Sequence, residues 1–157
     1  MARRLRPVEI DFVRAAPVRL VFARQISAAP EQVFRALAED VPGWTRWFSA
    51  VTLARATDGG AGREIRLRGG TRFEETILAA KAPEVYAYRV DTTNAPGVRA
   101  LVEEWCLTPQ GTGTRVQWTF AADGTAPFRF VLGLARAGLG RAFRDAMTSL
   151  DRLLARR

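Results

Sequence analysis

The feature that most constrains this sequence is a series of strand-like segments between residues 51 and 121, joined by connections of two to seven residues. Apolar and polar residues alternate within the segments, as they do in strands that are buried on one face. Every connection carries Gly or Pro, which is typical of hairpin loops. Because parallel strands need a longer crossover, we expect an antiparallel meander. The predicted strands are residues 51–57, 63–68, 71–80, 85–91, 99–108 and 114–121.

A further strand and a short helical region are predicted before this meander. Residues 18–27 have the pattern of a strand. Ser27 or Ala28 is expected to cap the helix that follows, because Pro30 suits an early helical position, where its missing N–H costs no hydrogen bond. The sequence Asp40-Val-Pro-Gly ends that helix, and a short helical turn or loop is expected at Trp44.

A long amphipathic helix is predicted over residues 127–156, where apolar residues recur at steps of three or four. Gly133, Gly138 and Gly140 weaken its first half by roughly 1 kcal/mol each relative to Ala. These glycines allow a kink or the close approach of a ligand, and a helix that begins only near Gly138 is the alternative. The apolar positions are Leu132, Ala135, Leu139, Phe143, Ala146, Leu150 and Leu153.

Together these elements predict one α+β domain, in which a curved antiparallel sheet of about seven strands wraps a long C-terminal helix. Two short helices lie between strands 1 and 2. One amphipathic helix cannot fill the concave face of such a sheet, so we expect a pocket of several hundred cubic ångströms between them. Its wall is predicted to include Phe73, Tyr88, Trp105, Trp118, Leu139 and Phe143.

The residue types that are missing exclude several kinds of chemistry. The chain has no histidine, which excludes Ser-His-Asp and Cys-His nucleophiles and histidine-bearing metal sites. Cys106 is the only cysteine and reads as a small core residue, so no internal disulfide is possible. No CxxC or P-loop motif occurs. We therefore expect neither a metal nor a cofactor.

The net charge of +8 is concentrated at the two ends of the chain. Residues 1–24 carry six Arg against two acids, and residues 127–157 carry seven Arg against two Asp. Such ends could meet nucleic acid or an anionic membrane. A solvated surface is the favoured interpretation of these arginines, and both partners are considered unlikely.

The N-terminal residues 1–17 are interpreted as a basic leader that contributes little to the core of a domain spanning residues 18–157. In this leader Ile10 and Phe12 could still add or cover an edge strand. The segment lacks the apolar core of a signal peptide, and the apolar stretch 128–134 is too short to span a bilayer. We therefore expect a cytoplasmic protein.

Strand alternation places two acids, Glu75 and Glu103, on the inward-facing sets of their strands. An unpaired carboxylate is costly in a dry core, so Arg24 is a possible partner. Three roles stay open: a solvated or salt-bridged position at the sheet rim, a polar anchor for a ligand head group, or an acid or base with a raised pKa.

Several local sequences resemble the START-like, or SRPBCC, superfamily, which includes the polyketide cyclase/dehydrase and lipid-transport families with the helix-grip fold. They are Ile26-Ser-Ala-Ala-Pro-Glu-Gln-Val-Phe, Trp44-Thr-Arg-Trp-Phe, Pro83-Glu-Val-Tyr-Ala-Tyr-Arg-Val, Trp105-Cys-Leu-Thr-Pro and Gly113-Thr-Arg-Val-Gln-Trp-Thr. The resemblance covers about residues 18–157. It implies a cavity for lipids, sterols, polyketides or quinones, and a minority of members catalyse cyclisation or dehydration. It carries over no catalytic residue.

The leading functional hypothesis is therefore binding or carriage of a hydrophobic or amphipathic small molecule in an internal pocket. The alternatives are an aromatase/cyclase-like enzyme that uses pocket Arg, Tyr and Glu side chains, and a membrane or nucleic-acid binder that uses the basic ends. Trp44, Trp47 and Phe48 either gate the pocket or pack under the sheet rim. The expected ligand-binding residues are Trp44, Trp47, Phe48, Phe73, Glu75, Tyr86, Tyr88, Glu103, Trp105, Trp118, Leu139, Phe143 and Met147.

Overall fold

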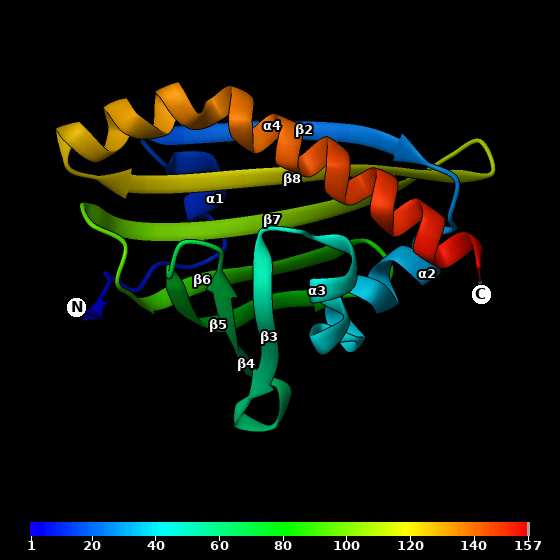
Figure 1. The fold of residues 1–157 in the computed structure, drawn as a ribbon, viewed down its shortest axis with the longest axis horizontal. Coiled ribbons are helices and arrows are strands. Elements are labelled where there is room, and N and C mark those ends of the chain that lie inside the picture. Colours follow the sequence, from blue (N-terminus) through cyan, green and yellow to red (C-terminus); the bar gives the residue numbers. More distant parts are fainter. Residues whose placement is uncertain (157) are drawn as a thin grey trace.

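Eight antiparallel strands form one curved sheet in the computed structural model, which describes residues 1–156 (Figure 1). The hydrogen-bonded order is β2-β8-β7-β6-β5-β4-β3, and β1 is attached to β6. Strands β3 to β8 are the meander predicted from the short connections. The strands are β1 (Arg3–Arg4), β2 (Val18–Ile26), β3 (Val51–Thr57), β4 (Gly62–Leu67), β5 (Arg72–Lys81), β6 (Val85–Thr93), β7 (Val98–Gln110) and β8 (Gly113–Gly124).

Helix α4 (Ala126–Ala155) follows the sheet and lies along β2 and β8 (Figure 1). Thr125 caps its N-terminus, because the Thr125 hydroxyl accepts a hydrogen bond from the Phe128 N–H at 3.3 Å. The helix is continuous through Gly133 and Gly138, so a start near Gly138 is wrong. Gly140 lies so close to the sheet that a Cβ atom there would stand 3.2 Å from the Phe22 ring.

Short helical segments connect β2 with β3 and cover the end of the sheet that lies near the C-terminal end of α4 (Figure 1). Ala29, rather than Ser27 or Ala28, is the N-cap of the first one, and Pro30 occupies its first turn. The Ser27 hydroxyl instead donates a hydrogen bond to Asp151 of α4 at 2.6 Å. The segments are α2 (Pro30–Phe34), the π-helical η1 (Arg35–Glu39), the 3-10 turn η2 (Val41–Gly43) and α3 (Trp44–Trp47), and a further 3-10 turn, η3 (Asp58–Gly60), joins β3 to β4.

The sheet is buried on both faces near β7 and β8. The concave face packs against α4, α2 and α3 and holds the larger core. On the convex face, α1 (Phe12–Ala15) places Phe12 and Val13 against Ala100, Val102 and Ala121. No helix in the described residues has both the length and the apolar character needed to cross a membrane.

The expectation that residues 1–17 contribute little to the core is wrong. The β6–β7 pairing ends at Arg89, and β1 takes up the free backbone beyond it by pairing with Thr92 and Thr93. This pairing carries Leu5 into a core cluster that also contains Val90, where Leu5 is only 5% exposed. The arginines of this segment stay at the surface while the apolar side chains between them are buried.

Replacement of Leu5 by Ala should lower the free energy of unfolding by about 2 kcal/mol, because a buried leucine loses both its transfer free energy and its packing. Ile10→Ala is the matched control in the same segment: Ile10 is 39% exposed, and its replacement should cost less than about 0.5 kcal/mol. Urea denaturation followed by circular dichroism measures both. Equal effects of the two substitutions would contradict the docking of β1.

Candidate functional site

An ion pair lies in the middle of the concave face, on neighbouring strands. Arg63 of β4 and Glu75 of β5 are directly opposite each other in the strand register. The Arg63 Nε–H donates a hydrogen bond to Glu75 Oε1, and the two side chains are only 2% and 1% exposed. The sheet register thus holds a guanidinium and a carboxylate together in an interior that excludes water.

A second polar pair lies beside the first, on β6 and β7. Tyr88 of β6 and Glu103 of β7 are also direct register partners, and the Tyr88 hydroxyl donates to Glu103 Oε1 at 2.7 Å. The same carboxylate oxygen accepts the indole N–H of Trp118 at 3.0 Å, and the Trp105 indole N–H donates to the Tyr88 hydroxyl at 3.2 Å. We call Arg63, Glu75, Tyr88 and Glu103 the polar cluster.

Aromatic rings surround the guanidinium of Arg63. Its central carbon lies 3.8 Å from the ring centroid of Tyr88, 4.5 Å from that of Trp44 and 5.7 Å from that of Tyr86. Such cation–π contacts stabilise a cation that has lost water. Nevertheless the Nη1 atom of Arg63 is buried without a hydrogen-bond partner among residues 1–156. An unused donor of this kind is rare in a folded protein and marks a place where a further acceptor could bind.

The polar cluster contains two carboxylates but one cation. Burial raises the pKa of Glu75 to about 7, against the opposing attraction of Arg63. Burial likewise raises the pKa of Glu103 above its ordinary range, although hydrogen bonds from Tyr88 and Trp118 and the charge of Arg63 oppose the shift. One guanidinium cannot neutralise two carboxylates, so both carboxyl groups hold a proton more tightly than exposed acids do. The cluster can therefore donate or accept a proton.

Aromatic side chains cover the polar cluster on the side of α4. Trp105 and Trp118 are register partners whose rings stack with centroids 5.4 Å apart, and Phe143 of α4 stacks on Trp118 at 5.9 Å. Trp44 and Trp47 of α3 meet Trp105 edge-on at 5.6 and 6.3 Å. These contacts join α3, α4 and the sheet into one aromatic layer.

This layer occupies the space in which a pocket was expected. Of five surface pockets in the described part of the chain, one of about 80 Å³ is lined by Phe73, and none of the five is lined by Tyr88, Trp105, Trp118, Leu139 or Phe143. The expectation of an open pocket with these walls is therefore not supported. The physical reason is that large rings from α3, β7 and β8 fill the volume that one helix leaves free.

The structure brings most of the residues expected to bind a ligand into this one region. Glu75 and Glu103 lie inside the sheet rather than at its rim, and Trp44, Trp47 and Phe48 are buried in the aromatic layer. Met147 is fully buried on α4. Phe73 and Leu139 lie nearer the edge and are only partly buried.

Sequence reasoning missed Arg63 and named Arg24 as a possible partner of the two acids. Arg24 is exposed and donates to the Arg144 carbonyl on α4 at 3.2 Å. The signal for Arg63 was present, because it alternates in phase with Ile65, which faces inward. An arginine on an inward-facing set, with glutamates on the inward-facing sets of two other strands, is a detectable pattern.

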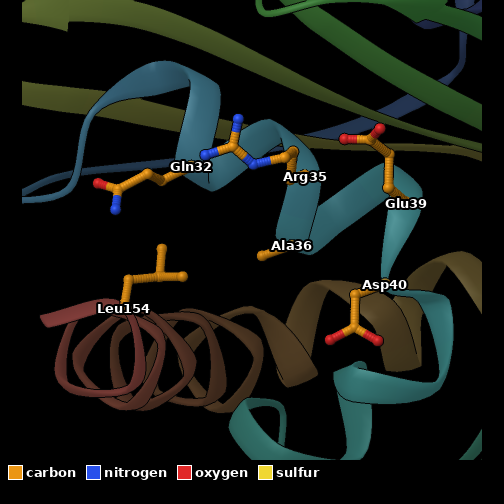
Figure 2. Close-up of a pocket in the computed structure, with 6 residues that line it drawn as sticks. All are labelled: Gln32, Arg35, Ala36, Glu39, Asp40 and Leu154. Carbon is orange, nitrogen blue, oxygen red and sulfur yellow. The ribbon is translucent and has the colours of Figure 1, made fainter. Parts of the chain in front are cut away.

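The pocket drawn in Figure 2 is an alternative site, between η1 and the end of α4. It has a volume of about 430 Å³ and is lined by Gln32, Arg35, Ala36, Glu39, Asp40 and Leu154. Its charged residues lie at the surface, where solvent weakens their interaction with any ligand. It is therefore a weaker candidate than the polar cluster.

Replacement of Glu103 by Gln should remove part of the pH dependence of stability. Glu103 has a raised pKa, so its stabilising proton is present below the unfolded pKa of about 4.5 and is lost as pH rises through the folded pKa. Gln keeps the oxygen that accepts from Tyr88 and Trp118. As pH rises from about 5 to about 8, the free energy of unfolding should therefore shift in favour of the variant.

The matched control is Glu64→Gln, one residue from Arg63 on the opposite face of β4. Hydrogen bonding from Arg66 lowers the pKa of Glu64, so the stability that Glu64 contributes is lost only as pH falls below its ordinary pKa. The difference between this variant and the unsubstituted protein should stay constant over the same range. Parallel pH profiles for Glu103→Gln and the unsubstituted protein would show that Glu103 holds no proton.

Comparisons with known proteins identify the family. The model of the family described as polyketide cyclase / dehydrase and lipid transport matches residues 17–155. An uncharacterized protein of Mycobacterium tuberculosis is 27% identical over 150 residues, which cover 92% of this chain and 89% of that protein. An uncharacterized protein of Mycobacterium bovis has the same identity and coverage.

Solved structures agree on the fold. The protein XoxI from Bacillus cereus has a TM-score of 0.70 at 15% identity, over 88% of this chain and 96% of that chain. A START superfamily protein from Mycobacterium smegmatis has a TM-score of 0.70 at 10% identity, over 88% and 97% of the two chains. The resemblance to the START-like superfamily is thus confirmed, and the chain belongs to the polyketide cyclase/dehydrase and lipid transport family.

Proposed function

We propose that this protein binds an amphipathic small molecule between α4 and the concave face of the sheet, with its polar group on the polar cluster. The observation that carries the proposal is the buried Arg63 guanidinium, whose Nη1 has no partner among the described residues. The family supports the apolar part of the ligand, because its description names polyketides and lipids.

Stability alone does not account for the polar cluster. Replacing a buried ion pair by apolar residues of similar volume is often neutral or stabilising, because desolvation of the charges offsets their attraction. Here the chain buries one arginine and two glutamates among tryptophan and tyrosine rings. A requirement to hold a ligand explains why such costly groups lie at the centre of the face.

The chemistry of the cluster defines the kind of polar group it would bind. Arg63 offers an unused N–H donor, which suits a carbonyl or carboxylate oxygen. The Tyr88 hydroxyl donates to Glu103 at 2.7 Å, so the pair offers both a hydroxyl and a carboxylate to a ligand hydroxyl or enol that both donates and accepts. The surrounding rings suit a flat unsaturated body. An aromatic or polyketide-like molecule with oxygen substituents meets all three conditions.

Ligand entry requires the aromatic layer to open. The first half of α4 has fewer buried side chains than the second half, so it is the part of the helix that is most easily displaced. Between residues 126 and 141 only Leu132 and Gly140 of this helix are buried. The second half buries Phe143, Ala146, Met147, Leu150 and Leu154. We therefore infer that the first half lifts while the second half stays docked.

Tryptophan fluorescence tests the proposal, because all four tryptophans of the chain lie in the aromatic layer. Titration with naringenin, a flat hydroxylated aromatic ketone, should quench the emission saturably with one site per chain. Arg63→Met should weaken binding at least about tenfold, as expected for the loss of a charged hydrogen bond. Arg66→Met is the control, because Arg66 lies on the same strand but is exposed.

Since Arg63→Met also breaks a buried ion pair, Tyr88→Phe serves as a second variant that removes one hydroxyl and keeps the ring. Circular dichroism establishes that each variant is folded. Weaker binding by folded Tyr88→Phe, with Arg66→Met unchanged, would support the site. Equal quenching of all variants, or quenching that never saturates, would rule out the polar cluster as the anchor for this probe.

A second candidate function is cyclisation of a poly-β-ketone, and the hydrogen-bonded Tyr88–Glu103 pair favours it. Ionised Glu103 would take a proton from a carbon between two carbonyls while Arg63 stabilises the enolate oxygen. The enolate carbon would then attack a second carbonyl of the same molecule, and the new alkoxide would regain the proton from Glu103. Conversion of a poly-β-ketone thioester by the unsubstituted protein, but not by Glu103→Gln that still binds naringenin, would indicate this enzyme.

A further inference from the structure

The outward face of the first half of α4 exposes three large apolar side chains. Phe130, Val131 and Leu134 are 68%, 60% and 70% exposed. Elsewhere in residues 1–156, the exposed large apolar side chains are Met1 and Ile10, which lie apart from this group. Single exposed apolar residues are common on soluble proteins, but a cluster on one element indicates an interaction surface.

The helical spacing sets these residues into one stripe with arginines around it. Phe130 and Leu134 are four residues apart and therefore lie one turn above the other, and Val131 is next to them. Arg129 and Arg136 are seven residues apart, so they share one side of the helix, about 100–120° around its axis from Phe130. Arg141, seven residues after Leu134, continues the stripe toward the middle of the helix. We call these six residues the α4 surface.

The α4 surface carries positive charge that nothing nearby neutralises. The sequence contains no acidic residue between Asp123 and Asp145. Within the described part of the chain, no ion pair involves Arg129, Arg136 or Arg141, and all three are exposed. A surface that is both apolar and uniformly cationic needs a partner that is both apolar and anionic.

We propose that the α4 surface docks this protein onto a membrane that contains anionic lipid. Phe130, Val131 and Leu134 enter the boundary between head groups and acyl chains, as the apolar face of an interfacial helix does. Arg129, Arg136 and Arg141 contact lipid phosphates, and their long side chains reach the head groups from beside the inserted residues. This assignment replaces the expectation from the sequence that an anionic membrane is an unlikely partner.

Other occupants fit the α4 surface less well. Nucleic acid would use the arginines, but it gains little from two aliphatic side chains at the centre of the contact. A second copy of this chain would bury the apolar residues, but a symmetric contact would bring two sets of unneutralised arginines together. Only a bilayer with anionic head groups matches both the apolar residues and the arginines of the α4 surface.

Co-sedimentation with lipid vesicles tests the proposal without any small-molecule ligand. We expect binding to vesicles of phosphatidylcholine mixed with phosphatidylglycerol, no binding to phosphatidylcholine alone, and release as salt concentration rises. The double variant Phe130→Ser/Leu134→Ser should lower the partition coefficient at least about tenfold, because two apolar side chains no longer insert. Arg129→Gln/Arg136→Gln should lower it as well.

The matched control is Ile10→Ser, which removes an exposed apolar residue from another part of the surface. It should leave vesicle binding unchanged. All of the substituted side chains are exposed, so the variants should fold, and circular dichroism checks this. In a separate variant, Phe130→Trp, tryptophan emission should shift to shorter wavelength when mixed vesicles are added.

Several outcomes would overturn the proposal. They are no binding to the mixed vesicles, binding that Phe130→Ser/Leu134→Ser leaves intact, tight binding to duplex DNA in place of vesicles, or self-association that depends on Leu134 in sedimentation velocity. None of these results bears on the binding of naringenin at the polar cluster, so failure of the docking proposal is distinguishable from failure of the proposed function.

Discussion

The structure depends on the fact that one helix covers only part of the concave face of a wide sheet. Helix α4 lies along β2 and β8, but the face extends across β7, β6, β5 and β4 to β3. Apolar strands cannot be left open to water, so something else has to fill the region beyond the helix. In this chain the tryptophans of α3, β7 and β8 do so, together with Phe143 of the helix itself. Close packing of these rings is what removes the expected open pocket.

The same filling creates the unusual environment of the polar cluster. Once the rings exclude water, every charge beneath them loses hydration, and only partners supplied by the register of the sheet can compensate. Arg63 meets Glu75, and Tyr88 meets Glu103, because each pair stands directly opposite on neighbouring strands. The compensation is incomplete, as the unused Arg63 donor and the raised pKa values of Glu75 and Glu103 show. Incomplete compensation leaves the cluster able to respond to a ligand or a proton.

The two halves of α4 have different surroundings although they form one continuous helix. The second half contacts the sheet and α3 through several buried side chains, and Asp151 accepts hydrogen bonds from Ser27. The first half has few buried residues, carries Gly133 and Gly138 in open space, and exposes Phe130 and Leu134. A helix held firmly at one end and loosely at the other is suited to move at the loose end. The proposed ligand entry and the proposed membrane contact both use that end.

The sequence by itself determined the order of the main elements from β2 onward, the antiparallel meander and the inward sets of several strands, because loop length and alternation are local properties. It placed Glu75 and Glu103 on inward sets for the same reason. It did not determine that Arg63 faces Glu75, that the aromatic rings close the pocket, or that the arginine-rich N-terminal segment buries Leu5. Those results depend on register, side-chain volume and a free stretch of β6 backbone, which are fixed only when distant segments meet.

The C-terminal helix shows most clearly which features the sequence determined and which features the tertiary structure decided. Periodicity assigned both Leu132 and Ala135 to the apolar face, yet Leu132 is buried and Ala135 is exposed. The sheet decided this, because it offers contact to only one side of the helix. The sequence determined that a long helix forms, and the tertiary structure decided which of its apolar residues are covered, because burial belongs to a pair of surfaces and not to one segment.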